Sequence, residues 1–117
     1  MQRFGDDEAG FSVDVDTTAR AVKIDGWGFW DPKVAAAFDS IVIEVCRGAP
    51  RGSDVSIDMG RLKPMRDEGQ SAVAHVVSTL AQLKVGTIAF TTTSHLTKLQ
   101  LMRIVRDAAP KDRVSFT

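Results

Sequence analysis

The chain has 117 residues, of which 44% are hydrophobic, and its 15 Lys and Arg residues balance 15 Asp and Glu residues. This length and apolar content suffice for one domain whose core needs neither a disulfide nor a metal. The zero formal net charge argues against a dedicated nucleic-acid-binding protein. The acidic N-terminus lacks a signal-like apolar run and no stretch reaches membrane-spanning length, so we expect a cytoplasmic protein without a membrane span.

The first elements expected along the chain are a tail and a hairpin. Residues 1–10 are predicted to be a mobile tail, followed by a single domain over residues 11–117. Segments 11–16 and 22–25 alternate apolar with polar residues, which is typical of half-buried strands. The short polar link Thr17–Arg20 between them predicts an antiparallel hairpin.

Three later segments have apolar residues at helical spacing. The first is predicted to begin at Asp31 and Pro32, because Asp caps a helix and Pro fits its first position, and to end near Gly48. The second runs from Asp67 to about residue 84. The third is predicted to be capped by Ser94.

Short strands are predicted over residues 54–58, around Ile88 and Phe90, and at Val114 and Phe116. The resulting order β-β-α-β-α-β-α-β predicts an α/β fold with three helices and a mixed, mostly parallel five-stranded sheet, whose first predicted strand is the antiparallel edge. Each predicted strand has one polar side, which sheets covered on both faces usually lack. We therefore expect all helices on one face, with the other face open or covered by a partner.

The segment from Asp58 to Gly69, DMGRLKPMRDEG, is predicted to be a strand end, a loop and a helix start. Asp67 is the predicted N-cap, and Gln70 three residues later completes a capping-box pattern. Glu68 adds negative charge where the helix dipole favours it. Strand-to-helix junctions of this kind often hold the functional residues of α/β proteins.

This junction resembles the STAS domain family of sporulation-type anti-sigma-factor antagonists, in which a strand ending in Asp is followed by an apolar loop and by Asp-Ser-Ser-Gly at a helix start. On that pattern Asp58 matches the strand-end Asp, Leu62 and Met65 match the apolar loop positions, and Gly69 matches the Gly. The predicted order of elements also resembles the STAS order over nearly the whole chain, and lacks only the helix that often closes that fold.

The motif departs from the family at its centre. Arg66 stands at the motif Asp, Asp67 at the first Ser, and Glu68 at the serine that a partner kinase phosphorylates in those antagonists. A carboxylate has no hydroxyl to phosphorylate, so the resemblance implies a fixed mimic that carries less charge than phosphoserine.

The function implied by the resemblance is a non-enzymatic, regulatory protein-interaction module. Its implied partner is a protein, with a kinase-type anti-sigma factor as the expected class, and a homodimer is one option for its assembly. The predicted partner-binding residues are Lys63, Pro64, Met65, Arg66, Asp67, Glu68 and Gly69.

The alternative is a small-ligand or lipid-associated domain of the same fold. In that interpretation an aromatic cluster and a hydroxyl-rich loop at a helix start line a pocket for a phosphate or carboxylate. Helix capping and core packing explain the same residues structurally. The candidate ligand-binding residues are Trp27, Trp30, Thr91, Thr92, Thr93, Ser94, His95 and Lys98.

Catalytic and metal chemistry are not expected. No nucleophile and base occur together in a recognisable pattern, and capping and solvation explain the carboxylates of the junction. His75 and His95 lie on different predicted helices and no metal-ligand spacing is present, so we predict no metal and no cofactor. Cys46 has no neighbouring activator and is expected to be a buried or half-buried structural thiol.

Overall fold

The computed structural model describes residues 1–110 and 112–117 in full, and the backbone of Lys111. Its strands are β1 (Gln2–Gly5), β2 (Gly10–Asp16), β3 (Ala21–Gly28), β4 (Asp54–Leu62), β5 (Ile88–Thr91) and β6 (Val114–Phe116). Its helices are α1 (Pro32–Arg47), α2 (Asp67–Gln82) and α3 (His95–Arg106), with a short 3-10 turn, η1 (Lys111–Arg113), before β6. No helix in the described part of the chain is long and apolar enough to cross a membrane.

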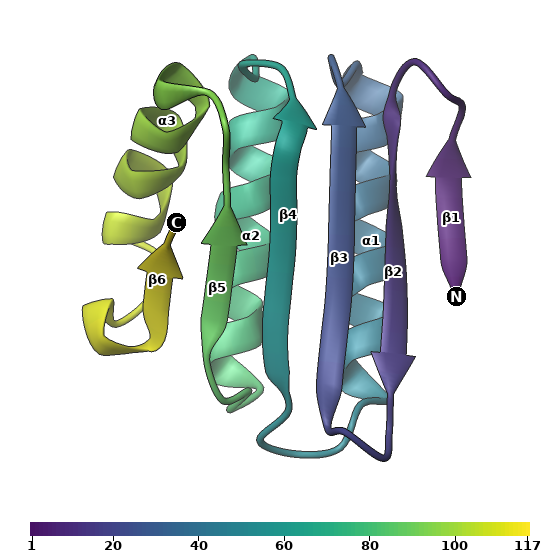
Figure 1. The fold of residues 1–117 in the computed structure, drawn as a ribbon, viewed down its shortest axis with the longest axis vertical. Helices are drawn as coiled ribbons and strands as arrows, with labels where there is room; N and C mark the ends of the chain where they lie inside the picture. The colour runs from purple at the N-terminus through teal and green to yellow at the C-terminus, as the bar shows by residue number, and fades with distance from the viewer.

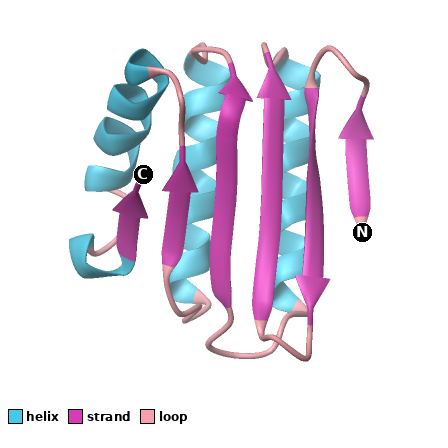
Figure 2. Cartoon of the chain, in the orientation of Figure 1, coloured by secondary structure: helices cyan, strands magenta, loops and turns pink.

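The six strands form one mixed sheet, in which spatial order follows chain order (Figure 1). β1 pairs with β2 and β2 with β3 in antiparallel fashion, whereas β3, β4, β5 and β6 are parallel neighbours. Each step between parallel strands passes through a helix (Figure 2). This arrangement confirms the α/β class, the three helices and the mixed sheet.

The sheet has a strand that the sequence did not predict. Residues 1–10 were expected to be a tail and the sheet to have five strands, whereas Gln2–Gly5 forms β1 and makes a sixth. The strand that begins at Gly10 is therefore not the antiparallel edge. A tight turn explains the difference, because the backbone N–H groups of Glu8 and Ala9 donate to Asp6 Oδ1 at 2.9 and 3.1 Å. These two bonds, with Ala9 foremost, lower the pKa of the Asp6 carboxyl below its usual range.

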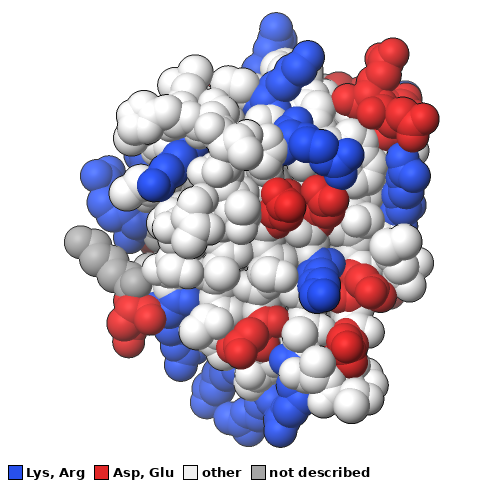
Figure 3. All heavy atoms as spheres, in the orientation of Figure 1, with Lys and Arg blue, Asp and Glu red and all other residues white. Residues whose placement is uncertain are grey.

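All three helices lie on the same face of the sheet, as predicted (Figure 1). β4 illustrates the consequence, because Val55 and Ile57 are buried while Ser56 and Asp58 are exposed. The open face carries acidic and basic side chains close together, and acidic atoms gather at the corner that holds the β1–β2 turn (Figure 3).

Aromatic rings fill the core at the junction of β2, β3 and α1. The Trp30 ring lies 4.7 Å from Phe38 of α1 and 6.2 Å from Phe11 of β2, measured between ring centroids. Its indole Nε1 donates to the Gly10 carbonyl at 3.1 Å, which satisfies the buried polar atom. Asp31 caps α1 by accepting from the Val34 N–H at 2.9 Å, as the sequence predicted.

Candidate functional site

The predicted junction begins later than expected, because β4 continues four residues beyond Asp58 and ends at Leu62. Asp58 was predicted at the strand end, but it lies within β4, opposite Asp25 of β3 and Thr91 of β5. The extension follows from pairing with β3, whose register shifts after Asp25 and resumes with Trp27 opposite Arg61 and Gly28 opposite Leu62. Asp58 is therefore a residue of the open sheet face and lies outside the loop.

The start of α2 also differs from the predicted capping box. Arg66 is the N-cap and makes no side-chain cap hydrogen bond, while Asp67 and Glu68 lie exposed in the first helical turn. The helix starts at this point because the Gln70 N–H already donates to the Arg66 carbonyl at 3.0 Å. Asp67 is thus inside the helix, where its charge meets the positive end of the helix dipole.

Two glutamine side chains fix the backbone of the junction loop through hydrogen bonds to Met65. Gln100 of α3 accepts from the Met65 N–H at 2.9 Å and donates to the Met65 carbonyl at 3.1 Å. Gln70 donates to the same carbonyl at 3.0 Å, and Arg103 of α3 donates to the Gln70 side chain at 2.8 Å. These contacts give the loop a defined conformation. Gln100 and Arg103 were not predicted from the sequence, because no local pattern connects them with a loop about thirty-five residues earlier.

The predicted partner-binding residues separate into buried and exposed groups. Met65 is 4% exposed and packs on Gly69, where an added Cβ would lie 3.1 Å from the Met65 side chain. These two residues shape the junction, whereas the remaining five form what we call the junction surface. The junction surface comprises the exposed residues Lys63, Pro64, Arg66, Asp67 and Glu68.

The junction surface is joined to the end of β3. The Lys63 N–H donates to the Gly28 carbonyl at 3.0 Å. The Arg66 guanidinium lies 5.5 Å from the centre of the Phe29 ring, which is 42% exposed. An aromatic ring and a guanidinium therefore lie side by side at the solvent-facing edge of the loop, a combination that is common in protein interfaces.

A shallow groove between α1 and α2 begins at Glu68. It encloses about 400 Å³ and is lined by Pro32, Ala35, Ala36, Asp39, Glu68, Ser71, Ala72 and His75. The alanines make a small apolar floor, and His75 Nδ1 lies 2.5 Å from Asp39 Oδ1 across the groove. Glu68 thus belongs both to the junction surface and to this groove, which the sequence analysis did not predict.

The two tryptophans proposed for a ligand pocket lie on opposite faces of the sheet. Trp30 is in the core beneath α1, packed on Phe38. Trp27 faces the open side, where the guanidinium groups of Arg3 and Arg61 lie 5.1 and 5.4 Å from its ring centre. The two indoles therefore do not line a common pocket.

The hydroxyl groups of the loop after β5 bond to the protein itself. Thr93 Oγ1 donates to the Gly60 carbonyl at 2.5 Å, and Ser94 Oγ accepts from the Thr97 N–H at 3.3 Å as the N-cap of α3. Thr92 Oγ1 lies 3.4 Å from the carbonyl of the last residue. Ser94 is thus the N-cap of α3 that the capping interpretation predicted. The other predicted ligand residues, at the end of β5 and in the first turn of α3, are Thr91, His95 and Lys98.

Cys46 lies on the buried side of α1, as expected, at 4% exposure. Burial raises the pKa of its thiol to about 11, so the thiol stays protonated at neutral pH and is a poor nucleophile. Within residues 1–110 and 112–117, no three His, Cys, Asp or Glu residues lie together in a way that could hold a metal ion.

Neither a protein-family model nor a curated protein matches the chain.

Proposed function

We propose that this chain is a non-enzymatic protein-interaction module that resembles the anti-sigma-factor antagonists of the STAS family. In this proposal the junction surface and the adjoining α1–α2 groove form one docking site. The proposed partner is a protein, with a kinase-type anti-sigma factor as the class to test first.

The observation that carries the proposal is the contrast between a firmly held backbone and an exposed rim. Met65 is bonded by two glutamines from two helices, while Arg66, Asp67 and Glu68 point to solvent beside a groove floored by alanines. A loop that is already ordered loses little conformational entropy on binding, which favours affinity. Exposed charges of both signs around a small apolar floor are suited to selecting one protein partner over others.

Glu68 is the proposed selectivity residue. It lies in the first turn of α2, where the helix dipole favours negative charge, and it lines the groove. Because a carboxylate side chain is neither added by a kinase nor removed by a phosphatase, the module acts in a constitutive form without the change that phosphorylation of serine would produce. Peptide mapping by mass spectrometry of the protein from its native cells should accordingly find no phosphate at this helix start.

The test begins with affinity capture from native cells and continues with the captured protein in purified form. Wild type, Glu68→Ser, Glu68→Lys and Glu44→Lys are titrated with it by calorimetry. Glu44 is exposed on α1 outside the groove, which makes Glu44→Lys a matched control for charge reversal. We expect Glu68→Lys to weaken binding by about tenfold or more, Glu68→Ser to weaken it less, and Glu44→Lys to leave it unchanged.

Two results would count against the proposal. Equal affinities for all four proteins would mean that α2 merely begins at this point and that no partner contacts Glu68. If the capture yields only enzymes that act on this chain, such as proteases, and no stable complex, the chain is not an interaction module.

A further inference from the structure

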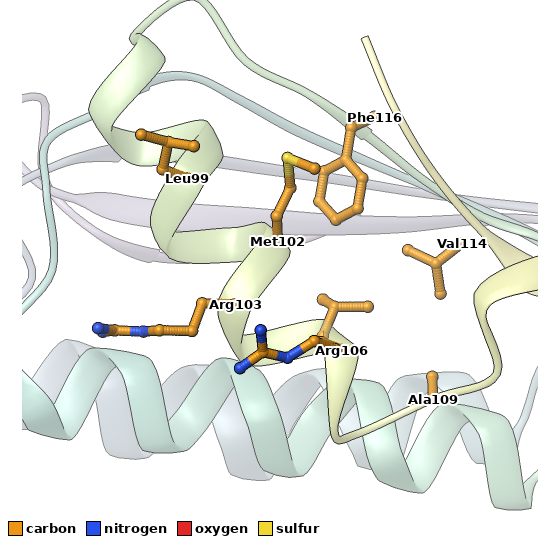
Figure 4. A pocket seen from close by; sticks show the side chains of 8 residues that line it. Leu99, Met102, Arg103, Arg106, Ala109, Val114 and Phe116 are labelled. Atoms are coloured by element: carbon orange, nitrogen blue, oxygen red, sulfur yellow. The ribbon is translucent and has the colours of Figure 1, made fainter.

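A second hollow lies beside α3, at the β6 edge of the sheet. It encloses about 610 Å³ between α3 and β6, and apolar side chains from both elements line it. Met102 of α3 and Phe116 of β6 point toward each other across it, with Val114 alongside (Figure 4). We call this hollow the α3–β6 groove.

The ridge of α3 beside this groove is unusually apolar for an exposed surface. Leu96, Leu99 and Met102 recur every three residues, which places them along one side of the helix, and they are 57%, 49% and 45% exposed. Large apolar side chains that line up next to an apolar hollow mark a binding surface more often than an isolated exposed Leu does.

The charged side chains that line the groove, Arg103 and Arg106, are both basic. α3 contains Lys98, Arg103 and Arg106 and has no Asp or Glu between His95 and its last residue. The Arg103 guanidinium donates to the neutral side chain of Gln70. Arg106 lies 3.8 Å from Asp107 in a highly exposed pair, which compensates little of its charge.

We propose that the α3–β6 groove binds an acidic amphipathic helix of a partner protein. Apolar side chains of such a helix would enter the hollow between Met102 and Phe116, as in other helix-in-groove complexes, and its carboxylates would meet Arg103 and Arg106. This surface shares no residue with the junction surface, although Arg103 also donates to Gln70, which bonds to Met65 of the junction loop. The variants Met102→Asp and Arg106→Glu leave that bond in place, so they test this proposal separately from the function proposed above.

Charge and shape favour this occupant over two others. A second copy docked with α3 against α3 would bring the arginines of both chains together, which is unfavourable. A lipid bilayer would contact the exposed ridge, but the half-buried Val114 and Phe116 line the recess and are reached only by a group that enters it.

The test uses three synthetic peptides of about 18 residues, which is about five helical turns. One has a leucine face and a glutamate face, one has the same leucine face with lysine in place of glutamate, and one is a scrambled glutamate peptide without an apolar face. Each is titrated into the full chain at physiological salt while backbone amide NMR shifts are followed.

We expect the amphipathic glutamate peptide to bind at least about tenfold more tightly than the other two, and to shift the amides of Leu99, Met102 and Phe116. Met102→Asp should abolish this binding. The double variant Arg103→Glu with Arg106→Glu should prefer the lysine peptide. The single variant Arg106→Glu should show a smaller preference for the glutamate peptide, and it provides the same test if the double variant folds poorly. Lys33→Glu with Arg47→Glu on α1 is the matched control and should change nothing.

Four results would overturn the proposal. The first three are equal binding of the glutamate and lysine peptides, amide shifts confined to other surfaces, and absence of binding to all three peptides. The fourth is a different occupant: the chain binds phosphatidylglycerol vesicles or associates with itself, Met102→Asp removes that binding, and the glutamate peptide does not bind.

Discussion

Cys46 is a single residue whose ionisation connects burial with stability. Its thiol titrates near 9.0 without the fold, and burial raises its pKa to about 11 in the folded chain. Between these values the unfolded chain loses the proton and the folded chain keeps it, so raising the pH in this range favours unfolding. We predict that the urea midpoint of unfolding decreases as the pH is raised from 9 to 11, and that this decrease is larger for wild type than for Cys46→Ala. An equal fall for both proteins would show that the thiol does not contribute.

Trp30 is the residue whose truncation should cost most. It is 2% exposed, packs against Phe11 and Phe38, and bonds to the Gly10 carbonyl through its indole nitrogen. We predict that Trp30→Ala lowers the free energy of unfolding by about 3–5 kcal/mol, as loss of a buried aromatic ring usually does. Denaturant titration measures this, and Phe29→Ala, at an exposed ring next in sequence, should cost far less. Similar losses for both variants would contradict the assignment of Trp30 to the core.

At the scale of elements, the two acidic helix starts differ in how they stabilise their helices. Asp31 caps α1 through a hydrogen bond, whereas Asp67 lies inside α2 without one. We predict that Asp31→Ala costs about 0.5–2 kcal/mol and that Asp67→Ala costs about 0.3–1 kcal/mol, because only the dipole term is lost in the second case. Urea unfolding of both variants decides between this assignment and the predicted capping box, which would make the two costs equal.

The loop before α2 depends on an element that follows it in sequence. The substitution Gln100→Ala removes both side-chain hydrogen bonds from α3 to the backbone of Met65, one at the Met65 N–H and one at its carbonyl. We predict a loss of about 1–3 kcal/mol and faster hydrogen exchange at the Met65 amide. Gln82→Ala, at an exposed position at the end of α2, is the control and should leave that exchange rate unchanged. Unchanged exchange in Gln100→Ala would mean that the loop is held by its own sequence.

At the scale of the whole molecule, β1 lies outside the main core. The buried apolar cluster begins at Phe11, and the residues of β1 are exposed along their whole length. Nevertheless, the Asp6 carbonyl accepts from the Trp27 indole at 2.7 Å, and Arg3 lies over the Trp27 ring.

We predict that deletion of residues 1–9 leaves a cooperatively folding chain of lower stability, with Trp27 emission shifted to longer wavelength. Circular dichroism and fluorescence measure both effects, and deletion in a Trp27→Phe background should show no such shift. Loss of cooperative unfolding would place β1 in the folding core.

Local chemistry along the chain was enough to predict the presence and order of strands β2 to β6 and helices α1 to α3, but not every boundary. Alternation predicted the hairpin and the later strands, Asp31 with Pro32 predicted the start of α1, and Ser94 predicted the start of α3. The polar side of each strand also predicted that all helices lie on one face. These features depend on neighbouring residues, because caps and periodic burial act within one or two turns or along a single strand.

Only the tertiary structure decided the features that arise between distant segments. β1 forms because the Asp6 turn returns it to β2, and β4 reaches Leu62 because β3 offers it a partner. The bonds from Gln100 to Met65 and the α3–β6 groove likewise bring together residues far apart in the chain. The same holds for the sheet faces on which Trp27 and Trp30 lie. Their energies come from pairing and packing across the fold, which no pattern in a single stretch of sequence records.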